Sequence, residues 1–165
     1  MGRGVLQIGL ISDTHGLLRP EAVVALRGAD LILHAGDIGK QSVLDALAEI
    51  ASVEAIAGNV DRAWCTLPEQ RSLLVGDTPV VLVHDSKTLD PTRLGDVVVC
   101  GHSHRPGIEA HDGRLWVNPG SAGPRRFSLP VCVGWLVLGD GPPRARLIPL
   151  EVAPPRSRAR SVRPR

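Results

Sequence analysis

The chain has 165 residues, a length that suits a single compact domain with a substantial core. Hydrophobic residues make up 43% of it but aromatic residues only 2%, so the core must be built from aliphatic side chains. Five of the 19 basic residues lie beyond Glu151, and the remaining 14 are outnumbered by 17 acidic residues. This distribution argues against a large basic surface for nucleic acids on the folded part.

The three cysteines, Cys65, Cys100 and Cys132, are odd in number and unevenly spaced, so they predict no disulfide framework. The N-terminal residues lack the long apolar segment of a secretory signal, and no stretch is long enough to span a membrane. Together these features predict a cytoplasmic protein with no membrane partner.

The first third of the chain alternates between two kinds of segment. Apolar runs at 5–12, 31–36 and 53–58 are typical of buried strands, and they are separated by helical patterns at 20–28 and 40–50. The first helical segment opens with a proline, and the second spaces its apolar residues along one side of a helix. This order predicts a βαβαβ unit of parallel strands.

In the remainder of the chain the sequence predicts mostly strands, at 80–84, 97–101, 114–118, 131–138 and 144–152. After residue 107, short turns such as "HDGR" and "GDGPP" favour antiparallel hairpins. The sequence therefore predicts an α/β protein in which mixed sheets are covered by helices. We expect one domain over residues 1–152, followed by a disordered tail rich in arginine and proline over 153–165.

Polar residues able to bind metals follow many of the predicted strands at their carboxyl ends. They lie in the stretches "SDTHG", "HAGD", "GNVD", "LVHD" and "GHSH". Because sites assemble at the carboxyl ends of parallel strands, we expect these residues to converge. The candidate metal ligands are Asp13, His15, Asp37, Asn59, His84, His102 and His104.

This set of donors contains nitrogen and oxygen but no thiolate. Such a set suits Mn, Fe, Zn, Ni or Co better than a structural zinc site or a magnesium site rich in water. A pair of divalent cations needs a bridging carboxylate and can clamp both oxygens of an in-line displacement at phosphorus. The simpler alternative is that these residues only cap strands and fill turns. Against it, four of the six histidines are at the ligand positions of these motifs.

The five motifs, in this order, resemble those of the calcineurin-like metallophosphoesterases, in particular the small bacterial and archaeal phosphodiesterases related to the retromer subunit Vps29. The stretch "VNPGSAGPRR" also resembles a segment of that family, and the similarity runs from about residue 6 to 150. The resemblance implies a four-layer αββα sandwich of two mixed β-sheets flanked by helices. It also implies a dinuclear, metal-dependent phosphoesterase, most simply a phosphodiesterase.

Residue roles follow from the same resemblance. A first metal ion would be held by Asp13, His15 and His104. A second would be held by Asn59, His84 and His102. Asp37 would bridge the two ions, a hydroxide between them would attack phosphorus, and Asn59 would also orient a phosphate oxygen. We expect Mn²⁺ as the metal, with Ni²⁺, Fe²⁺, Zn²⁺ and Co²⁺ as alternatives.

The sequence departs from the family pattern at three places. Val60 stands where larger relatives carry a histidine that can protonate the leaving group, so that general acid is absent. We therefore expect a preference for esters whose leaving group departs easily, such as aryl esters. Asp85 stands where the family usually has glycine, and it could crowd the second metal or act as an outer carboxylate. The segment 85–96 is short where the family usually has a fuller helix.

Several alternatives stay open at the level of sequence. The main rival function is a non-catalytic interaction scaffold of the Vps29 kind that retains a metal site, and the arginine-rich tail could bind nucleic acid. His34 is interpreted as support for the site more readily than as a ligand. Asp61 could support the site or only form a turn, and the pair at 125–126 could bind phosphate or only be solvated. The sequence does not indicate an oligomeric state.

Overall fold

The computed structural model describes residues 4–153. The predicted tail therefore lies almost entirely outside the described residues. In chain order the helices and strands are β1 (Leu6–Ile11), α1 (Pro20–Ala25), β2 (Leu31–His34), α2 (Gln41–Ala48), β3 (Ser52–Ala55), β4 (Gln70–Val75), β5 (Thr78–Val83), the 3₁₀ helix η1 (Ser86–Thr88), β6 (Val97–Val99), β7 (Gly107–His111), β8 (Arg114–Asn118), β9 (Cys132–Leu138) and β10 (Arg144–Pro149).

The strands form two sheets of five, in the orders β10-β9-β1-β2-β3 and β4-β5-β6-β8-β7. In the first sheet β1, β2 and β3 are parallel, as the βαβαβ pattern predicts, and β9 pairs antiparallel with both β1 and β10. In the second sheet β5, β6 and β8 are parallel, while β4 and β7 are antiparallel to their neighbours. Both sheets are mixed, which confirms the predicted fold class.

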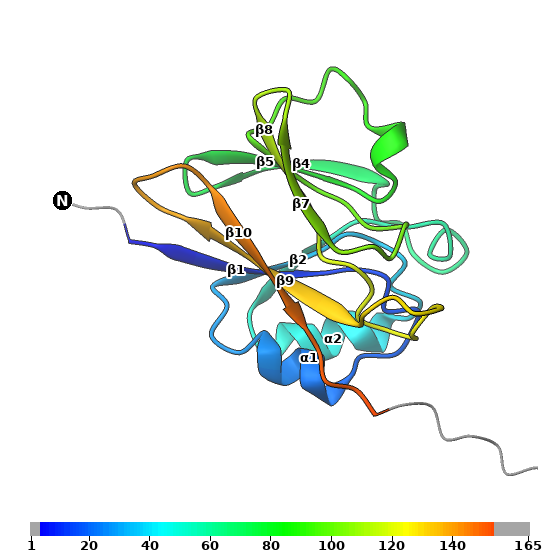
Figure 1. The fold of residues 1–165 in the computed structure, drawn as a ribbon. Coiled ribbons are helices and arrows are strands. Elements are labelled where there is room, and N and C mark those ends of the chain that lie inside the picture. Colours follow the sequence, from blue (N-terminus) through cyan, green and yellow to red (C-terminus); the bar gives the residue numbers. More distant parts are fainter. Residues whose placement is uncertain (1–3, 154–165) are drawn as a thin grey trace, which may run out of the picture.

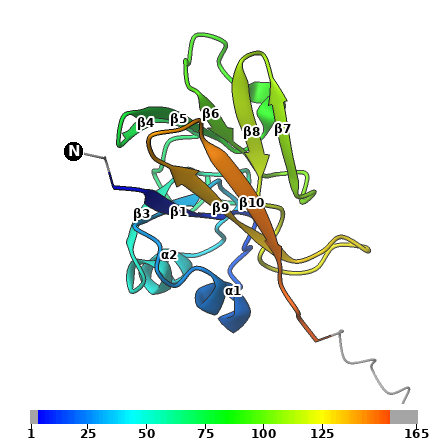
Figure 2. The same cartoon turned by 60° about the vertical axis from the view of Figure 1, so that its left-hand side comes forward.

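The main core lies between the two sheets. Ile8 and Leu10 of β1 pack there against Leu82 of β5 and Val99 of β6, and all four are fully buried. A second cluster fills the space between the first sheet and the helices α1 and α2, which lie on its outer face (Figures 1 and 2). Burial of each large aliphatic side chain contributes about 1.5–3 kcal/mol, so these two clusters hold the layers together.

The layer outside the second sheet is thin. The short segment 85–96 forms only η1, so few apolar residues cover this face, among them Leu89 and Trp116. A hollow of about 490 Å³ remains there, lined in part by Lys87, Arg105 and Trp116. None of the helices in the described part of the chain has the length and hydropathy that a membrane span requires.

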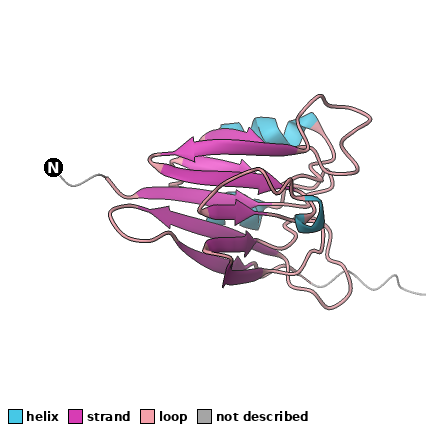
Figure 3. Ribbon diagram, turned by 90° about the horizontal axis from the view of Figure 1, so that it is seen from above, coloured by secondary structure: helices cyan, strands magenta, loops and turns pink. Residues whose placement is uncertain are grey.

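The loops that matter for function gather at one edge of the sandwich. Seen from above, the longer loops crowd the edge opposite the N-terminal end (Figure 3). The predicted strands at 31–36, 53–58 and 97–101 end earlier than expected, at His34, Ala55 and Val99. The residues left over form the loops at this edge, and these loops carry the candidate ligands.

Candidate metal centre

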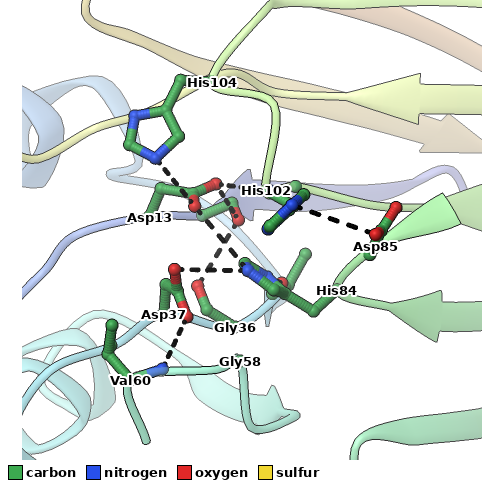
Figure 4. A network of polar contacts seen from close by, with 12 residues as sticks. Asp13, Gly36, Asp37, Gly58, Val60, His84, Asp85, His102 and His104 are labelled. Atoms are coloured by element: carbon green, nitrogen blue, oxygen red, sulfur yellow. Dashed lines mark hydrogen bonds and ion pairs between the residues drawn. The ribbon is translucent and has the colours of Figure 1, made fainter. Parts of the chain in front are cut away.

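The candidate ligands come from loops that follow strands of both sheets. Asp13 follows β1 and Asp37 follows β2, whereas His84 follows β5 and the pair at 102 and 104 follows β6 (Figure 4). Backbone hydrogen bonds join the first two loops, from the Asp13 N–H to the Gly36 carbonyl (3.0 Å) and from the His15 N–H to the Asp37 carbonyl (2.9 Å). The convergence expected from strand order is therefore present in the fold.

An unusual backbone conformation marks the same loops. The left-handed region costs free energy for residues other than glycine, and such strain concentrates at functional sites. Seven non-glycine residues among the described ones have a positive φ, and five of them are candidate ligands. They are Asp13 (54°), His15 (46°), Asp37 (52°), His102 (66°) and His104 (59°).

One group of ligand atoms unites Asp13, His15 and His104, the three residues predicted for a first metal ion. Nε2 of His104 lies 3.2 Å from Oδ1 of Asp13 and 3.3 Å from Nε2 of His15. The Asp13 and His104 side chains are almost completely buried, and the His15 side chain is 16% exposed. Three donors from two different sheets thus face one point.

A second group unites Asp13, Asp37 and His84, all of them buried. Nε2 of His84 lies 3.3 Å from Oδ2 of Asp37 and 4.0 Å from Oδ1 of Asp13. The same Asp37 oxygen is 3.8 Å from Nε2 of His15, so this carboxylate faces both groups, as its predicted bridging role requires. Asp13 is also common to both groups, which the sequence analysis did not anticipate.

Two predicted ligands lie at the rim. His102 makes an edge-to-face contact with His84, with ring centroids 5.2 Å apart, but its side chain is 45% exposed. Its Nε2 faces Oδ2 of Asp85 at 3.9 Å (Figure 4), so Asp85 lies beside His102 rather than between the two groups. Asn59 is exposed and lines a hollow of about 500 Å³ together with His84 and Asp85. This hollow therefore borders the centre at His84.

The residues present fit a bound cation. Two buried polar atoms that face the centre, Asp13 Oδ1 and His84 Nε2, have no hydrogen-bond partner. Such orphaned atoms are costly unless something else satisfies them. The Nδ1–H of His84 donates to the Ala35 carbonyl (2.7 Å), which leaves a lone pair on Nε2 in the neutral ring. That lone pair points toward the two carboxylates, as a metal ligand must.

Electrostatics couple Asp37 and His84. Burial alone would raise the pKa of Asp37, but His84, the Val60 N–H and His15 lower it to about 2. Burial alone would lower the pKa of His84, but Asp37, the Ala35 carbonyl and Asp13 raise it above its usual value. Two carboxylates in one buried site therefore favour a positive charge between them. A cation bound there would supply this charge and compete with protonation of His84.

Asp61 is a positioning residue rather than a simple turn residue. Its buried carboxylate accepts hydrogen bonds from the N–H groups of Ile38 (3.0 Å), Gly39 (2.8 Å) and Gly58 (2.9 Å), and from the Trp64 indole (3.2 Å). These contacts tie the loop after β2 to the loop after β3. The open alternatives for Asp61 are thereby resolved in favour of support for the site.

His34 also supports the site and is not among the grouped ligand atoms. Its Nδ1 accepts from the Gly36 N–H (3.2 Å), so its Nε2 carries the proton and donates to Thr14 Oγ1 at 3.0 Å. The Thr14 hydroxyl in turn donates to the Ile38 carbonyl (2.9 Å). Complete burial lowers the pKa of His34 to about 4, so the ring is neutral at physiological pH.

The sequence analysis missed three polar residues that hold the loops. Ser12 Oγ donates to Asp13 Oδ2 (2.7 Å), and Ser121 Oγ donates to the Asp13 carbonyl (2.9 Å). Asn118 Nδ2 donates to the Gly101 carbonyl (2.9 Å), next to His102. Ser12 is the first residue of the motif "SDTHG", and the other two belong to "VNPGSAGPRR". The second segment therefore supports the ligand loops through hydrogen bonds to their backbone.

Comparisons with known proteins agree with this geometry. Residues 6–140 match the model of the calcineurin-like phosphoesterase superfamily domain. A probable metallophosphoesterase of Methanocaldococcus jannaschii is 34% identical over 164 residues, which cover 90% of this chain and 83% of the relative.

Solved structures agree on the fold. The chain resembles vacuolar protein sorting 29 from Cryptosporidium parvum (TM-score 0.72, 20% identity, 88% of this chain and 98% of that one). It also resembles a novel archaeal phosphodiesterase (TM-score 0.72, 24% identity, 88% of this chain and 100% of that one). The match to the superfamily model and the similarity to the archaeal relative agree with the order of the motifs and the clustering of the donors. We conclude that this chain belongs to the calcineurin-like phosphoesterase superfamily, the family that its motifs resemble.

Proposed function

We propose that the protein is a phosphodiesterase that binds two divalent metal ions, with Mn²⁺ as the preferred ion, and that it acts on a phosphoester substrate in the cytoplasm. The observation that carries this proposal is the pair of donor groups that share Asp13 beside an open hollow. Membership of the superfamily supports hydrolysis of phosphoesters. The name of the archaeal structural relative supports a diester as the substrate.

The division of labour among the residues follows the two groups. Asp13, His15 and His104 would hold one ion, and Asn59, His84 and His102 the other, with Asp37 between them. Bound divalent ions supply charge stabilisation at phosphorus and make water a stronger nucleophile at neutral pH. Asn59 lies on the wall of the hollow, where its amide can donate to a phosphate oxygen and orient the ester.

The test is metal analysis followed by hydrolysis of bis(p-nitrophenyl) phosphate with Mn²⁺, Ni²⁺, Zn²⁺ or Mg²⁺ added to the metal-free protein. We expect activity with metal, and a loss of roughly 10³-fold in kcat/KM in Asp37→Ala, because metal-based stabilisation amounts to several kcal/mol. His102→Ala should also abolish most of the activity. His111→Ala is the matched control, since this exposed histidine stacks on Trp116 away from the centre.

Two results would contradict the proposal. Hydrolysis that is equal with and without metal would remove the role of the donor groups. Tight metal binding without hydrolysis of any diester would favour the non-catalytic scaffold instead. A metal content near one ion per chain in the active protein would contradict the dinuclear part alone.

A further inference from the structure

The loop 123–130, between β8 and β9, exposes the only phenylalanine of the chain. Phe127 is 93% exposed, and its φ of 51° lies in the left-handed region that bulky side chains rarely adopt. Neither feature contributes to folding, because the ring buries almost nothing and the backbone is strained. Apart from Asp112, which lies in a tight turn, all other described non-glycine residues with a positive φ are candidate ligands. The same strained backbone makes Phe127 a candidate for function as well.

This loop is anchored directly on the metal centre. Its base is held by Ser121, whose hydroxyl donates to the Asp13 carbonyl, and by the Ala122 N–H, which donates to the Ser12 carbonyl at 3.0 Å. Gly123 packs so closely on the Thr14 backbone that no Cβ would fit there. Arg19 Nε donates to the Gly123 carbonyl (2.9 Å). The loop then projects from the body, in yellow in Figure 2.

Two arginines stand between this anchor and the phenylalanine. Arg125 and Arg126 are both exposed, and neither forms an ion pair with an acidic residue within residues 4–153. The segment 119–131 contains no acidic residue. Unpaired guanidinium groups beside a phosphoester site are suited to bind a further phosphate.

We propose that loop 123–130 is a nucleotide subsite, in which a base stacks on Phe127 while Arg125 and Arg126 bind a phosphate next to the scissile one. This deepens the proposed function and rests on it. A base can stack only on an aromatic ring with an exposed face, and a second phosphate needs unpaired cationic side chains to bind it. This loop offers both features together. The preferred substrates are then nucleotide diesters rather than simple alkyl diesters.

Three esters with the same p-nitrophenolate leaving group separate the contributions. Methyl p-nitrophenyl phosphate has no base, thymidine 5′-(p-nitrophenyl phosphate) adds one, and its 3′-phosphorylated form adds a second phosphate. We expect Phe127→Ala to lower kcat/KM about tenfold for both thymidine esters and to leave the methyl ester unchanged. Phe127→Trp should retain the activity, and Arg126→Ala should affect only the ester with the second phosphate.

Leu74→Ala is the matched control, because Leu74 is also exposed (70%) but lies on β4, remote from this loop. Equal effects of Phe127→Ala on the methyl and thymidine esters would overturn the subsite. A change of oligomeric state in Phe127→Ala, measured by sedimentation, together with unchanged selectivity would assign the loop to an interface between copies and would also overturn it.

Failure of the proposed function is distinguishable from failure of the subsite. If no ester is hydrolysed with any metal, the enzymatic proposal falls. Binding of thymidine 3′,5′-bisphosphate to the wild type and to Phe127→Ala, measured by calorimetry, then decides the subsite alone. Binding that is weakened about tenfold by the substitution supports it, and equal binding or no binding by the wild type contradicts it. A short single-stranded oligonucleotide in the same assay tells whether the ligand is a nucleotide or a nucleic acid strand.

Discussion

Val60 has a backbone role in the centre but offers no proton to a leaving group. Its N–H donates to Asp37 Oδ1 (3.1 Å), and the residue is 43% exposed. We expect rates to fall steeply as the leaving-group pKa rises, because general-acid help of about 10²–10⁴-fold is missing from this position. The measurement is kcat/KM over a series of methyl aryl phosphodiesters, with Val60→His expected to flatten the dependence. A flat series for the wild type would contradict this prediction.

His34 makes the metal-free protein sensitive to acid. Its pKa is about 4 in the fold and near 6.5 when unfolded, so the unfolded chain binds more protons between these values. The contribution of His34 to the free energy of unfolding is therefore complete above pH 6.5. It is lost as the pH falls toward 4, by about 1.4 kcal/mol per pH unit. Urea unfolding in EDTA at pH 6.5 and 4.5 measures this slope.

The matching variant is His34→Gln, whose side chain keeps a donor for Thr14 but does not titrate. The variant should have a lower free energy of unfolding than the wild type at pH 6.5. On acidification to pH 4.5, its free energy of unfolding should fall by about 2–3 kcal/mol less than that of the wild type. The raised pKa of His84 acts in the opposite direction and is common to both proteins, so it cancels in the difference. Identical slopes for the two proteins would show that His34 titrates normally.

At the scale of elements, the sequence predicts the buried strands better than the edge strands. The runs that give β1, β2, β5 and β6 are mostly apolar because most of the residues in these strands are buried. The two missed strands, β4 and β7, are the edges of the second sheet. Four of the five residues of β7 are exposed, so it carries no apolar run to detect. Its presence was indicated only by the hairpin turn "HDGR".

Five of the seven predicted ligands lie in the two donor groups, whereas Asn59 and His102 do not, and the geometry of the groups was not predictable from the sequence. Strand ends bring Asp13, Asp37 and His84 together, and that follows from topology alone. The left-handed backbone of the ligand loops and the sharing of Asp13 by both groups depend on close contacts between loops that are distant in the chain. The outward placement of His102 toward Asp85 depends on the same contacts. Spacing within one motif does not encode such contacts.

The loop after β3 approaches the loop after β2 so closely that Gly58 is required. A Cβ at this position would collide with the carboxylate and the backbone nitrogen of Asp37. We expect Gly58→Ala to destabilise the protein by about 1–3 kcal/mol and to weaken metal binding, because Asp37 must move. Gly107→Ala is the control, since nothing lies within 4 Å of a Cβ added there. Denaturant unfolding and metal titration that give equal results for the two variants would refute the steric argument.

At the scale of the whole molecule, the candidate metal centre lies where loops of the two sheets meet, at one edge of the interface between the sheets. Asp13 and Asp37 belong to loops of the first sheet, whereas His84 and His104 belong to loops of the second. Buried aliphatic side chains hold the sheets together elsewhere along this interface. At the loop edge the contacts are polar, and two buried atoms that face the centre have no hydrogen-bond partner, so a bound cation would stabilise this edge.

A bound cation should therefore act as a cross-link between the sheets and raise the thermal stability of the whole domain. Metal at 100 times its Kd contributes about 2.7 kcal/mol for one site, which corresponds to an increase in Tm of about 5–10 °C for a protein of this size. Calorimetry with Mn²⁺ and with EDTA measures the shift. His111→Ala should keep it, and Asp37→Ala should lose most of it, because removal of this carboxylate opens the interface on the side of the first sheet. An equal shift in Asp37→Ala would place the metal elsewhere, and the cross-link would then have no structural basis.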